Sequence, residues 1–372
     1  MKVLVAGDFC PQNRVSSLFE QGKYYEVLDG VKDVIHDADY AMVNFECPIR
    51  LGGETPNLDR LSLFCSLDGL KAVQYAGFDC VTLANNHFRD WGDGGVISTL
   101  KCCKELGVDY VGGGENLDEA RTILYKRING EKLAIINCCE HEFSLATESR
   151  CGSNPLNPVI QYRAIIEARK NSDYVIVIVH GGHEYYQLPS PRMQETYRFF
   201  VEAGADAVVN HHQHCMSGYE LYKGKPIFYG IGNFCFDLNM AKSPLWYNGY
   251  MVSFDFDREG IAFDIIPYIQ CKDKAAVTII PYEDIKEEIN SLCGIIADSQ
   301  KLAKKAEDYY NSCQSSVANT IEPYTNRYLK ALRRRGLVPN FLTKKWLMYL
   351  CNYTMCESHR DKLEYFFEHT IY

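Results

Sequence analysis

Short apolar runs alternate with segments of helical periodicity through the first 215 residues, and this alternation strongly constrains the fold. The runs lie at residues 2–6, 40–45, 78–84, 174–179 and 205–209. They are rich in β-branched or small residues and apolar on both faces, which is typical of strands buried in a largely parallel sheet. Helical periodicity occurs between them at residues 68–76, 96–106, 155–170 and 192–203. Gly107 and Gly204 follow two of these segments, where a helix end favours glycine.

Other patterns predict antiparallel strands in the same domain. Asn129 and Gly130 form a hairpin dipeptide between runs at 122–128 and 132–138. Two more hairpins are expected, at 219–222 with 225–230 and at 250–256 with 260–266. We therefore expect a mixed α/β domain.

The pattern changes after about residue 281. Residues 283–313 are typical of one amphipathic helix, and residues 325–335 and 343–354 are also expected to be helical. The sequence thus predicts a domain at 1–280 followed by a helical C-terminal region at 281–372. That region carries a basic cluster of five residues, which either forms a solvated face or meets an anionic partner such as a membrane headgroup or a charged polymer. The cluster consists of Arg333, Arg334, Arg335, Lys344 and Lys345.

Composition excludes several classes of protein. The formal net charge of −9 disfavours binding to duplex nucleic acid, whose phosphates attract basic surfaces. No run approaches the roughly 18 apolar residues of a transmembrane segment, and the N-terminal run is too short for a secretory signal. A cytoplasmic location is expected. The 16 cysteines include no CxxC pair, which favours buried, reduced thiols over a disulfide framework.

Side chains able to bind a cation follow the predicted strands, at the edge where open α/β sheets hold ligands. They are Asp8, Glu46, Asn86, His87, Asp90, His180, His183, Glu184, His211, His212 and His214. Six of the ten histidines fall in just three of these strand ends, so the sequence predicts a metal site. Carboxylates, an amide and imidazoles suit manganese, iron or zinc. The ligands suffice for two ions about 3.5–4 Å apart, an arrangement suited to phosphoester chemistry.

Six segments resemble the CapA family, and the resemblance covers roughly residues 1–240. They are Gly7-Asp8, Asn44-x-Glu46-x-Pro48, Leu83-Ala84-Asn85-Asn86-His87-x-x-Asp90-x-Gly92, His180-Gly181-Gly182-x-Glu184-Tyr185, His212-x-His214 and Gly232-Asn233-Phe234. Members of this family are named for roles in capsule and poly-γ-glutamate synthesis and resemble calcineurin-like metallophosphatases in fold. The resemblance implies a metallophosphatase-like layered α/β sandwich with mixed sheets.

The same resemblance implies roles for individual residues. The implied metal ligands are Asp8, Glu46, Asn86, His180, His212 and His214. Glu46 would bridge two ions, with Asp8 and His214 on the first. Asn86 and the other two histidines would hold the second, and His87 would face the substrate as general acid or oxyanion stabiliser.

Two departures from the metallophosphatase pattern leave alternatives open. Cys10 stands where a calcineurin-like enzyme has a histidine, and Glu46 replaces the shorter bridging aspartate. A one-metal or non-catalytic protein therefore remains an alternative, and Cys10 either fills space or acts as a thiolate ligand. Four further residues are candidates for substrate contact or for support of a ligand: Asp90, His183, Glu184 and Asn233.

The backbone around His212 and His214 has two alternatives. In a continuing strand their side chains would share one face. If the strand ends before them, a loop must direct both side chains inward.

The expected function is that of a metal-dependent phosphoester hydrolase in capsule or surface-polymer biosynthesis, acting on a phosphorylated or polyanionic intermediate. The alternatives are a non-catalytic metal-binding component of a capsule or polyglutamate synthesis complex, and an amide or peptide hydrolase that uses the same metal-activated water. Specificity is expected from residues 51–63, residues 182–191 and the C-terminal helices.

Overall fold

The computed structural model describes residues 1–53, 55–56, 61–238, 243–257, 260–320, 326–339 and 342–355. Residues 54 and 57–60 of the expected specificity loop, and residue 325 of an expected helix, lie outside this part. The chain forms two compact units, Met1–Ala303 and Lys304–Tyr372.

The first unit contains a large mixed sheet of eight strands. Seven follow one another in the order β16 (Val277–Ile279), β15 (Ile261–Gln270), β14 (Asn248–Phe256), β1 (Lys2–Phe9), β2 (Tyr40–Phe45), β3 (Cys80–Thr82) and β4 (Asp109–Val111), and β13 (Asn233–Cys235) pairs with the end of β1. The strands β1 to β4 and β13 run parallel, whereas β14, β15 and β16 pair antiparallel. The sheet therefore combines the buried parallel runs with the hairpin predicted at 250–266.

A second mixed sheet of six strands completes the central layers. Its order is β11 (Tyr219–Tyr222), β12 (Lys225–Phe228), β10 (Ala207–His211), β9 (Tyr174–His180), β7 (Glu131–Cys139) and β6 (Leu124–Ile128). The strands β7, β9, β10 and β12 are parallel, and the hairpins β6–β7 and β11–β12 close the two edges. A short pair, β5 (Gly113–Gly114) and β8 (Gly152–Ser153), lies outside both sheets.

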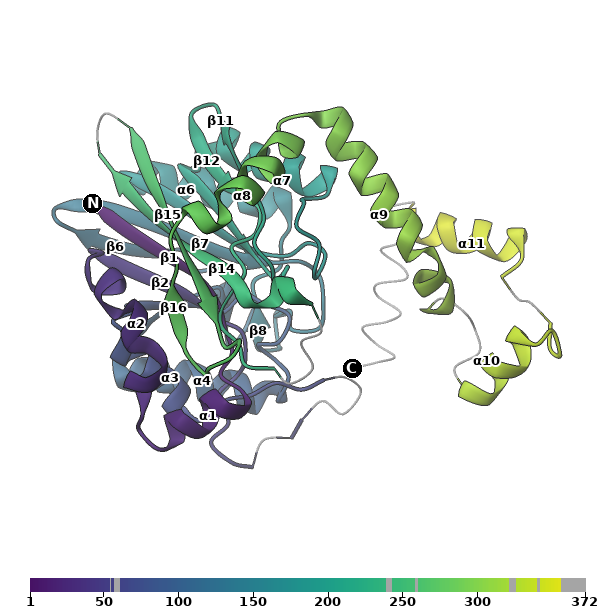
Figure 1. The fold of residues 1–372 in the computed structure, drawn as a ribbon, viewed down its shortest axis with the longest axis horizontal. Helices are drawn as coiled ribbons and strands as arrows, with labels where there is room; N and C mark the ends of the chain where they lie inside the picture. Colours follow the sequence, from purple (N-terminus) through teal and green to yellow (C-terminus); the bar gives the residue numbers. More distant parts are fainter. Residues whose placement is uncertain are drawn as a thin grey trace. The chain divides into compact units, whose positions relative to one another are not determined.

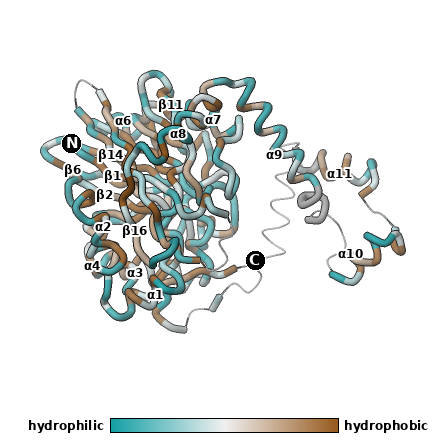
Figure 2. Tube along the Cα trace, in the orientation of Figure 1, coloured by the Kyte–Doolittle hydropathy of each residue, from teal (hydrophilic) through white to brown (hydrophobic). Residues whose placement is uncertain are grey.

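Both faces of each sheet are buried because helices cover the outer sides. Val3 and Val5 of β1 join the core between the sheets, whereas Leu4 and Ala6 join the core beneath the helices. The helices α1 (Asn13–Glu20), α2 (Tyr24–His36), α3 (Leu67–Ala76) and α4 (Gly92–Leu106) cover the first sheet, and α6 (Pro158–Asn171) and α7 (Pro191–Ala203) cover the second (Figure 1). Figure 2 shows the apolar strands inside this first unit. The predicted fold class, a layered α/β sandwich with mixed sheets and a C-terminal helical region, is confirmed.

The C-terminal helices differ from the prediction in one respect. The prediction of a single helix at 283–313 is wrong, because the chain forms two helices there, α8 (Glu283–Ile296) and α9 (Ser299–Thr320). Asp298 Oδ1 accepts hydrogen bonds from the backbone N–H groups of Gln300 and Lys301, and this cap starts a new helix. The apolar face of α8 packs in the first unit, where Ile289 is fully buried.

The remaining elements are short or belong to the second unit. They are α5 (Leu117–Ala120), the 3-10 turn η1 (Pro244–Tyr247), α10 (Arg327–Arg334) and α11 (Lys344–Met355). Among the described residues, no helix combines the length and apolarity needed to cross a bilayer. Fifteen cysteines lie in this part of the chain as free thiols, and twelve of them are buried.

Candidate metal centre

The carboxyl ends of parallel strands from both sheets bring the predicted ligands together. Asp8 lies near the end of β1, and Glu46 directly follows β2. His180 ends β9, while His212 and His214 follow β10. All five side chains are buried, so they meet inside the domain.

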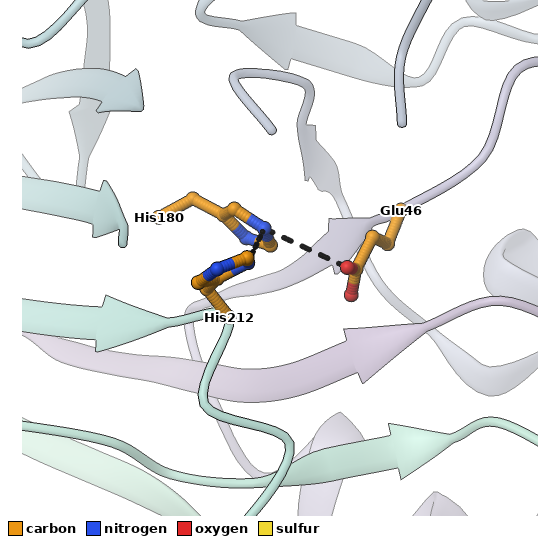
Figure 3. Close-up of side chains that lie close together, drawn as sticks. All are labelled: Glu46, His180 and His212. Carbon is orange, nitrogen blue, oxygen red and sulfur yellow. Dashed lines mark hydrogen bonds and ion pairs between the residues drawn. The ribbon is translucent and has the colours of Figure 1, made fainter. Parts of the chain in front are cut away.

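Two groups of potential ligands share one carboxylate. Glu46, His180 and His212 place one ligand atom each within 4.8 Å of one another, and so do Asp8, Glu46 and His214. Glu46 Oε1 lies 3.6 Å from Nε2 of both His180 and His214. Figure 3 shows the rings of His180 and His212 turned toward the Glu46 carboxylate. We call Asp8, Glu46 and His214 the first cluster. We call Glu46, His180 and His212 the second cluster.

The Glu46 carboxylate is fully buried, and neither oxygen has a hydrogen-bond partner. Burial and the negative charge of Asp8 raise the pKa of Glu46 well above its usual range. A buried carboxylate without partners is costly unless a cation balances it. A carboxylate that makes no hydrogen bond and is shared between His214 in one group and His180 and His212 in the other therefore fits a ligand that bridges a pair of divalent ions.

Asp8 and His214 are held in place by polar neighbours. Asn44 Nδ2 donates to Asp8 Oδ1 over 2.7 Å, and His214 Nδ1 lies 2.9 Å from Asn233 Oδ1. Because an amide oxygen can only accept, Asn233 keeps the proton on Nδ1 of His214 and leaves Nε2 for the cluster. Burial raises the pKa of Asp8, but the imidazoles of His211 and His214, whose Nδ1 atoms lie 3.2 and 3.4 Å from its oxygens, outweigh burial and hold that pKa well below its usual range.

The amide oxygen of Asn86 lies beside the second cluster, and we count Asn86 as a member of that cluster from here on. Nε2 of His180 lies 3.0 Å from Asn86 Oδ1 and 3.1 Å from His212 Nδ1. Burial lowers the pKa of His180 well below its usual range and, with the charge of His214, lowers the pKa of His212 to about 3. Both imidazoles are therefore neutral at pH 7, which is the form that binds metal ions.

His212 and His214 lie in a loop, which is the second of the two backbone alternatives. The strand β10 ends at His211, so the two side chains do not share a strand face, and that interpretation is wrong. His212 has φ 85° and His214 has φ 54°, both in the left-handed region. Such residues cost about 1–3 kcal/mol each and occur where the surroundings enforce them, commonly at functional sites. Here the His212 N–H donates to Asp8 Oδ2 over 3.3 Å.

His87 lies beside the second cluster rather than within it. Its Nδ1 is 2.7 Å from Oδ2 of Asp90, a fully buried carboxylate that also accepts a hydrogen bond from the Leu63 N–H. The side chain of His87 is 14% exposed. His87 directly follows Asn86 in the chain, and its charge is a minor contribution to the low pKa of His212.

Three other predicted residues lie outside the two clusters. Cys10 is buried in the core, where desolvation raises its pKa and the Gln12 amide donates to Sγ over 3.4 Å. His183 is half-buried, with its ring centre 6.4 Å from that of Tyr186. Glu184 is exposed, and its charge contributes to the raised pKa of Glu46.

Aromatic rings cover His214 on one side of the first cluster. The ring of Trp246 lies 5.0 Å from the imidazole, and that of Phe236 lies 5.5 Å away. Tyr185, 41% exposed, stacks on Trp246 at 6.0 Å. These apolar walls lower the local dielectric and so strengthen electrostatic interactions within the cluster.

Sequence reasoning missed Glu142. Its Oε2 accepts a hydrogen bond from Asn86 Nδ2 over 3.2 Å, and its Oε1 lies 3.3 Å from Nε2 of His212. Glu142 closely follows β7, so the rule that located the other ligands applies to it too. The hairpin pattern at residues 132–138 gives no sign of this position, because it does not reveal that β7 also pairs in parallel with β9.

The chain has clear relatives. The family described as bacterial capsule synthesis protein PGA_cap matches residues 2–238. The capsule biosynthesis protein CapA of Bacillus anthracis is 32% identical over 277 residues, which cover 72% of this chain and 67% of that protein. The PGA biosynthesis protein CapA of Bacillus subtilis is 29% identical over 266 residues, covering 70% and 69%.

Among solved structures, a 5'-nucleotidase precursor from Thermus thermophilus has a TM-score of 0.44 at 12% identity, covering 78% of this chain and 57% of that one. This similarity is too distant to bear on activity. The sequence relationships are much stronger, and on their basis this chain belongs to the bacterial capsule synthesis protein PGA_cap family, with CapA proteins among its relatives.

Proposed function

We propose that this protein is a metal-dependent phosphoester hydrolase that acts on a phosphorylated or polyanionic intermediate of capsule or surface-polymer biosynthesis. The observation that carries the proposal is the position of Glu46. Its carboxylate belongs to both ligand clusters, is fully buried, and has no hydrogen-bond partner on either oxygen. That arrangement suits a bridging ligand between two ions.

The ligand set defines which ions the site would hold. Asp8, Glu46 and His214 would hold one ion, and Glu46, His180 and His212 the other, with the Asn86 amide oxygen beside them. Mixed carboxylate, amide and imidazole donors favour manganese, iron or zinc. When bound, such a pair would supply positive charge for the phosphoryl oxygens and a water of lowered pKa.

In this proposal His87 acts as the general acid that donates a proton to the leaving group. Asp90 holds Nδ1 of the imidazole at 2.7 Å, which fixes the ring and places a negative charge beside its protonated form. A protonated ring carries a second N–H on Nε2 and can donate that proton to the departing oxygen. The partial exposure of His87 leaves room for contact with a substrate.

A second candidate is a non-catalytic metal-binding component of capsule or polyglutamate synthesis. The observation that favours it is Cys10, which replaces the histidine of the metallophosphatase pattern and lies outside the first cluster, leaving that cluster with three ligand residues among the described part of the chain. Weak occupancy of one site would be the consequence.

Assays on the metal-free protein, reloaded with Mn²⁺ or Zn²⁺, separate these candidates. The substrates are p-nitrophenyl phosphate, bis(p-nitrophenyl) phosphate and γ-glutamyl-p-nitroanilide. The proposal expects metal-dependent cleavage of a phosphoester, loss of that activity in Glu46→Gln, and no loss in the control Glu167→Gln, an exposed position on α6. Metal binding without any cleavage favours the non-catalytic component, and cleavage of the anilide alone indicates an amide hydrolase.

A further inference from the structure

The loop after β7 places the carboxylate of Glu142 in contact with two residues of the second cluster. Glu142 contacts Asn86 through Oε2 and His212 through Oε1, at 3.2 and 3.3 Å. Its side chain is 33% exposed, whereas Asn86 and His212 are buried. The carboxylate thus lies at the outer side of the cluster, and it belongs to neither group of close ligand atoms.

The contact with Asn86 decides which way its amide points. Only the nitrogen of an amide donates and only the oxygen accepts, and a carboxylate accepts. Because Nδ2 donates to Glu142, Oδ1 faces the opposite direction, where it lies 3.0 Å from His180 Nε2. The reverse orientation would present a non-coordinating NH₂ group to the cluster.

The contact with His212 decides the position of its proton in the same way. A neutral imidazole carries one N–H, and Glu142 at 3.3 Å from Nε2 favours the proton on that atom. Nδ1 then keeps its lone pair, and this atom lies 3.1 Å from Nε2 of His180. The other tautomer would direct an N–H into the cluster.

We propose that Glu142 is a positioning residue, which sets the amide orientation of Asn86 and the tautomer of His212 so that both present lone pairs to the second ion. This inference rests on the metal site of the proposed function. Carboxylates that hold the distal atoms of metal ligands commonly raise metal affinity, and their removal typically costs about 10–100-fold.

The loop itself is anchored independently of Glu142. Ser144 Oγ donates to the Asn86 carbonyl oxygen over 2.6 Å and accepts from the Arg89 N–H over 3.0 Å. Substituting Glu142 therefore removes the two side-chain contacts while these backbone anchors remain. Glu140, on the same loop, pairs with Arg192 at 2.5 Å and is the matched control.

The test measures zinc affinity and the His212 tautomer in the full chain without substrate. Metal-free wild type, Glu142→Gln, Glu142→Ala and Glu140→Gln are titrated with Zn²⁺ by competition with a chromophoric chelator. The tautomer of His212 is determined from ¹⁵N chemical shifts of the metal-free proteins. Both Glu142 variants should bind one zinc about 10–100-fold more weakly and lose the Nε2–H preference. Their metal-free melting temperatures, and all properties of Glu140→Gln, should match wild type.

The inference would be overturned if the Glu142 variants bound zinc as tightly as wild type, or if Glu140→Gln lost as much zinc affinity as they do. It would also be overturned if the His212 tautomer were unchanged in the Glu142 variants, or if wild type bound no zinc. Lower melting temperatures in both Glu142 variants would overturn it in favour of a general structural role. The hydrolase proposal fails separately: a wild type that binds zinc but cleaves nothing contradicts that proposal alone. An active enzyme whose Glu142→Gln variant keeps full affinity contradicts only the role of Glu142.

Discussion

Nδ1 of His87 lies 2.7 Å from Oδ2 of Asp90, so a fully buried carboxylate orients the one predicted catalytic residue that lies outside the ligand clusters. Asn86, the preceding neighbour of His87, instead directs its amide oxygen to His180. Two adjacent residues after β3 thus have different surroundings, and their substitution should have different effects.

His87→Ala should leave metal content and folding nearly unchanged while kcat on a working phosphoester falls by about 10²–10⁴, the usual contribution of a positioned acid or base. Asn86→Ala should lose metal as well as rate, because its oxygen belongs to the second cluster. Elemental analysis and steady-state kinetics on the same preparations check both effects. Equal turnover for wild type and His87→Ala would rule out the catalytic role.

Glu46→Gln should stabilise the metal-free protein, increasingly so as pH rises. Burial and Asp8 raise the folded-state pKa of Glu46, so its protonated form is favoured in the folded protein. Below the unfolded-state pKa of Glu46, wild type therefore keeps its full stability relative to the variant. It loses that relative stability as pH rises through the folded-state pKa of Glu46. Denaturant unfolding between pH 4 and 8 measures this difference.

Added Zn²⁺ should reverse the order, because it stabilises wild type by binding and leaves Glu46→Gln almost unaffected. Parallel stability curves for the two metal-free proteins would contradict the assigned environment of Glu46. Glu167→Gln, at an exposed position, supplies the control for loss of one carboxylate.

Gly7→Ala should destabilise the first unit and disturb the adjacent Asp8. A Cβ atom at Gly7 would stand 2.0 Å from the carbonyl oxygen of Gly232, which accepts a hydrogen bond from the Asp8 N–H. Overpacking of this kind costs about 1–3 kcal/mol or more. Gly294→Ala is the matched control, since nothing lies within 4 Å of its Cβ position in α8, and it should be neutral or stabilising by up to about 1 kcal/mol. Thermal unfolding compares the two variants.

Ile289→Ala should destabilise the first unit by about 2–5 kcal/mol, because this fully buried side chain joins the core between the sheets. Leu329→Ala, which alters a side chain 41% exposed on α10, should leave that unfolding transition unchanged. A chain ending at Ala303 should fold, whereas one ending at residue 280 lacks α8 and should be markedly less stable. Equal stability of the two truncated chains would show that α8 is dispensable.

Much of the fold could be predicted because it depends on local patterns. The run at 2–6 is apolar on both faces, and β1 indeed has Val3 on one face and Leu4 on the other, each in a different core. The positive φ of Gly107 at the end of α4 follows from the freedom of a residue without Cβ. The helices α1 and α2 were not predicted, although the buried residues Val27, Val31 and Ile35 recur at helical spacing along α2, so the local pattern of an amphipathic helix is present there.

The sequence by itself determined which residues follow the strands, and hence that Asp8, Glu46 and His180 stand where parallel sheets hold ligands. Only the tertiary structure decided that the edges of two sheets meet, so that Glu46 is shared between the imidazole that ends β9 and those that follow β10. It also decided that Glu142 faces Asn86 and His212. These contacts join residues far apart along the chain, and their geometry comes from sheet packing and loop conformation, which no local periodicity encodes.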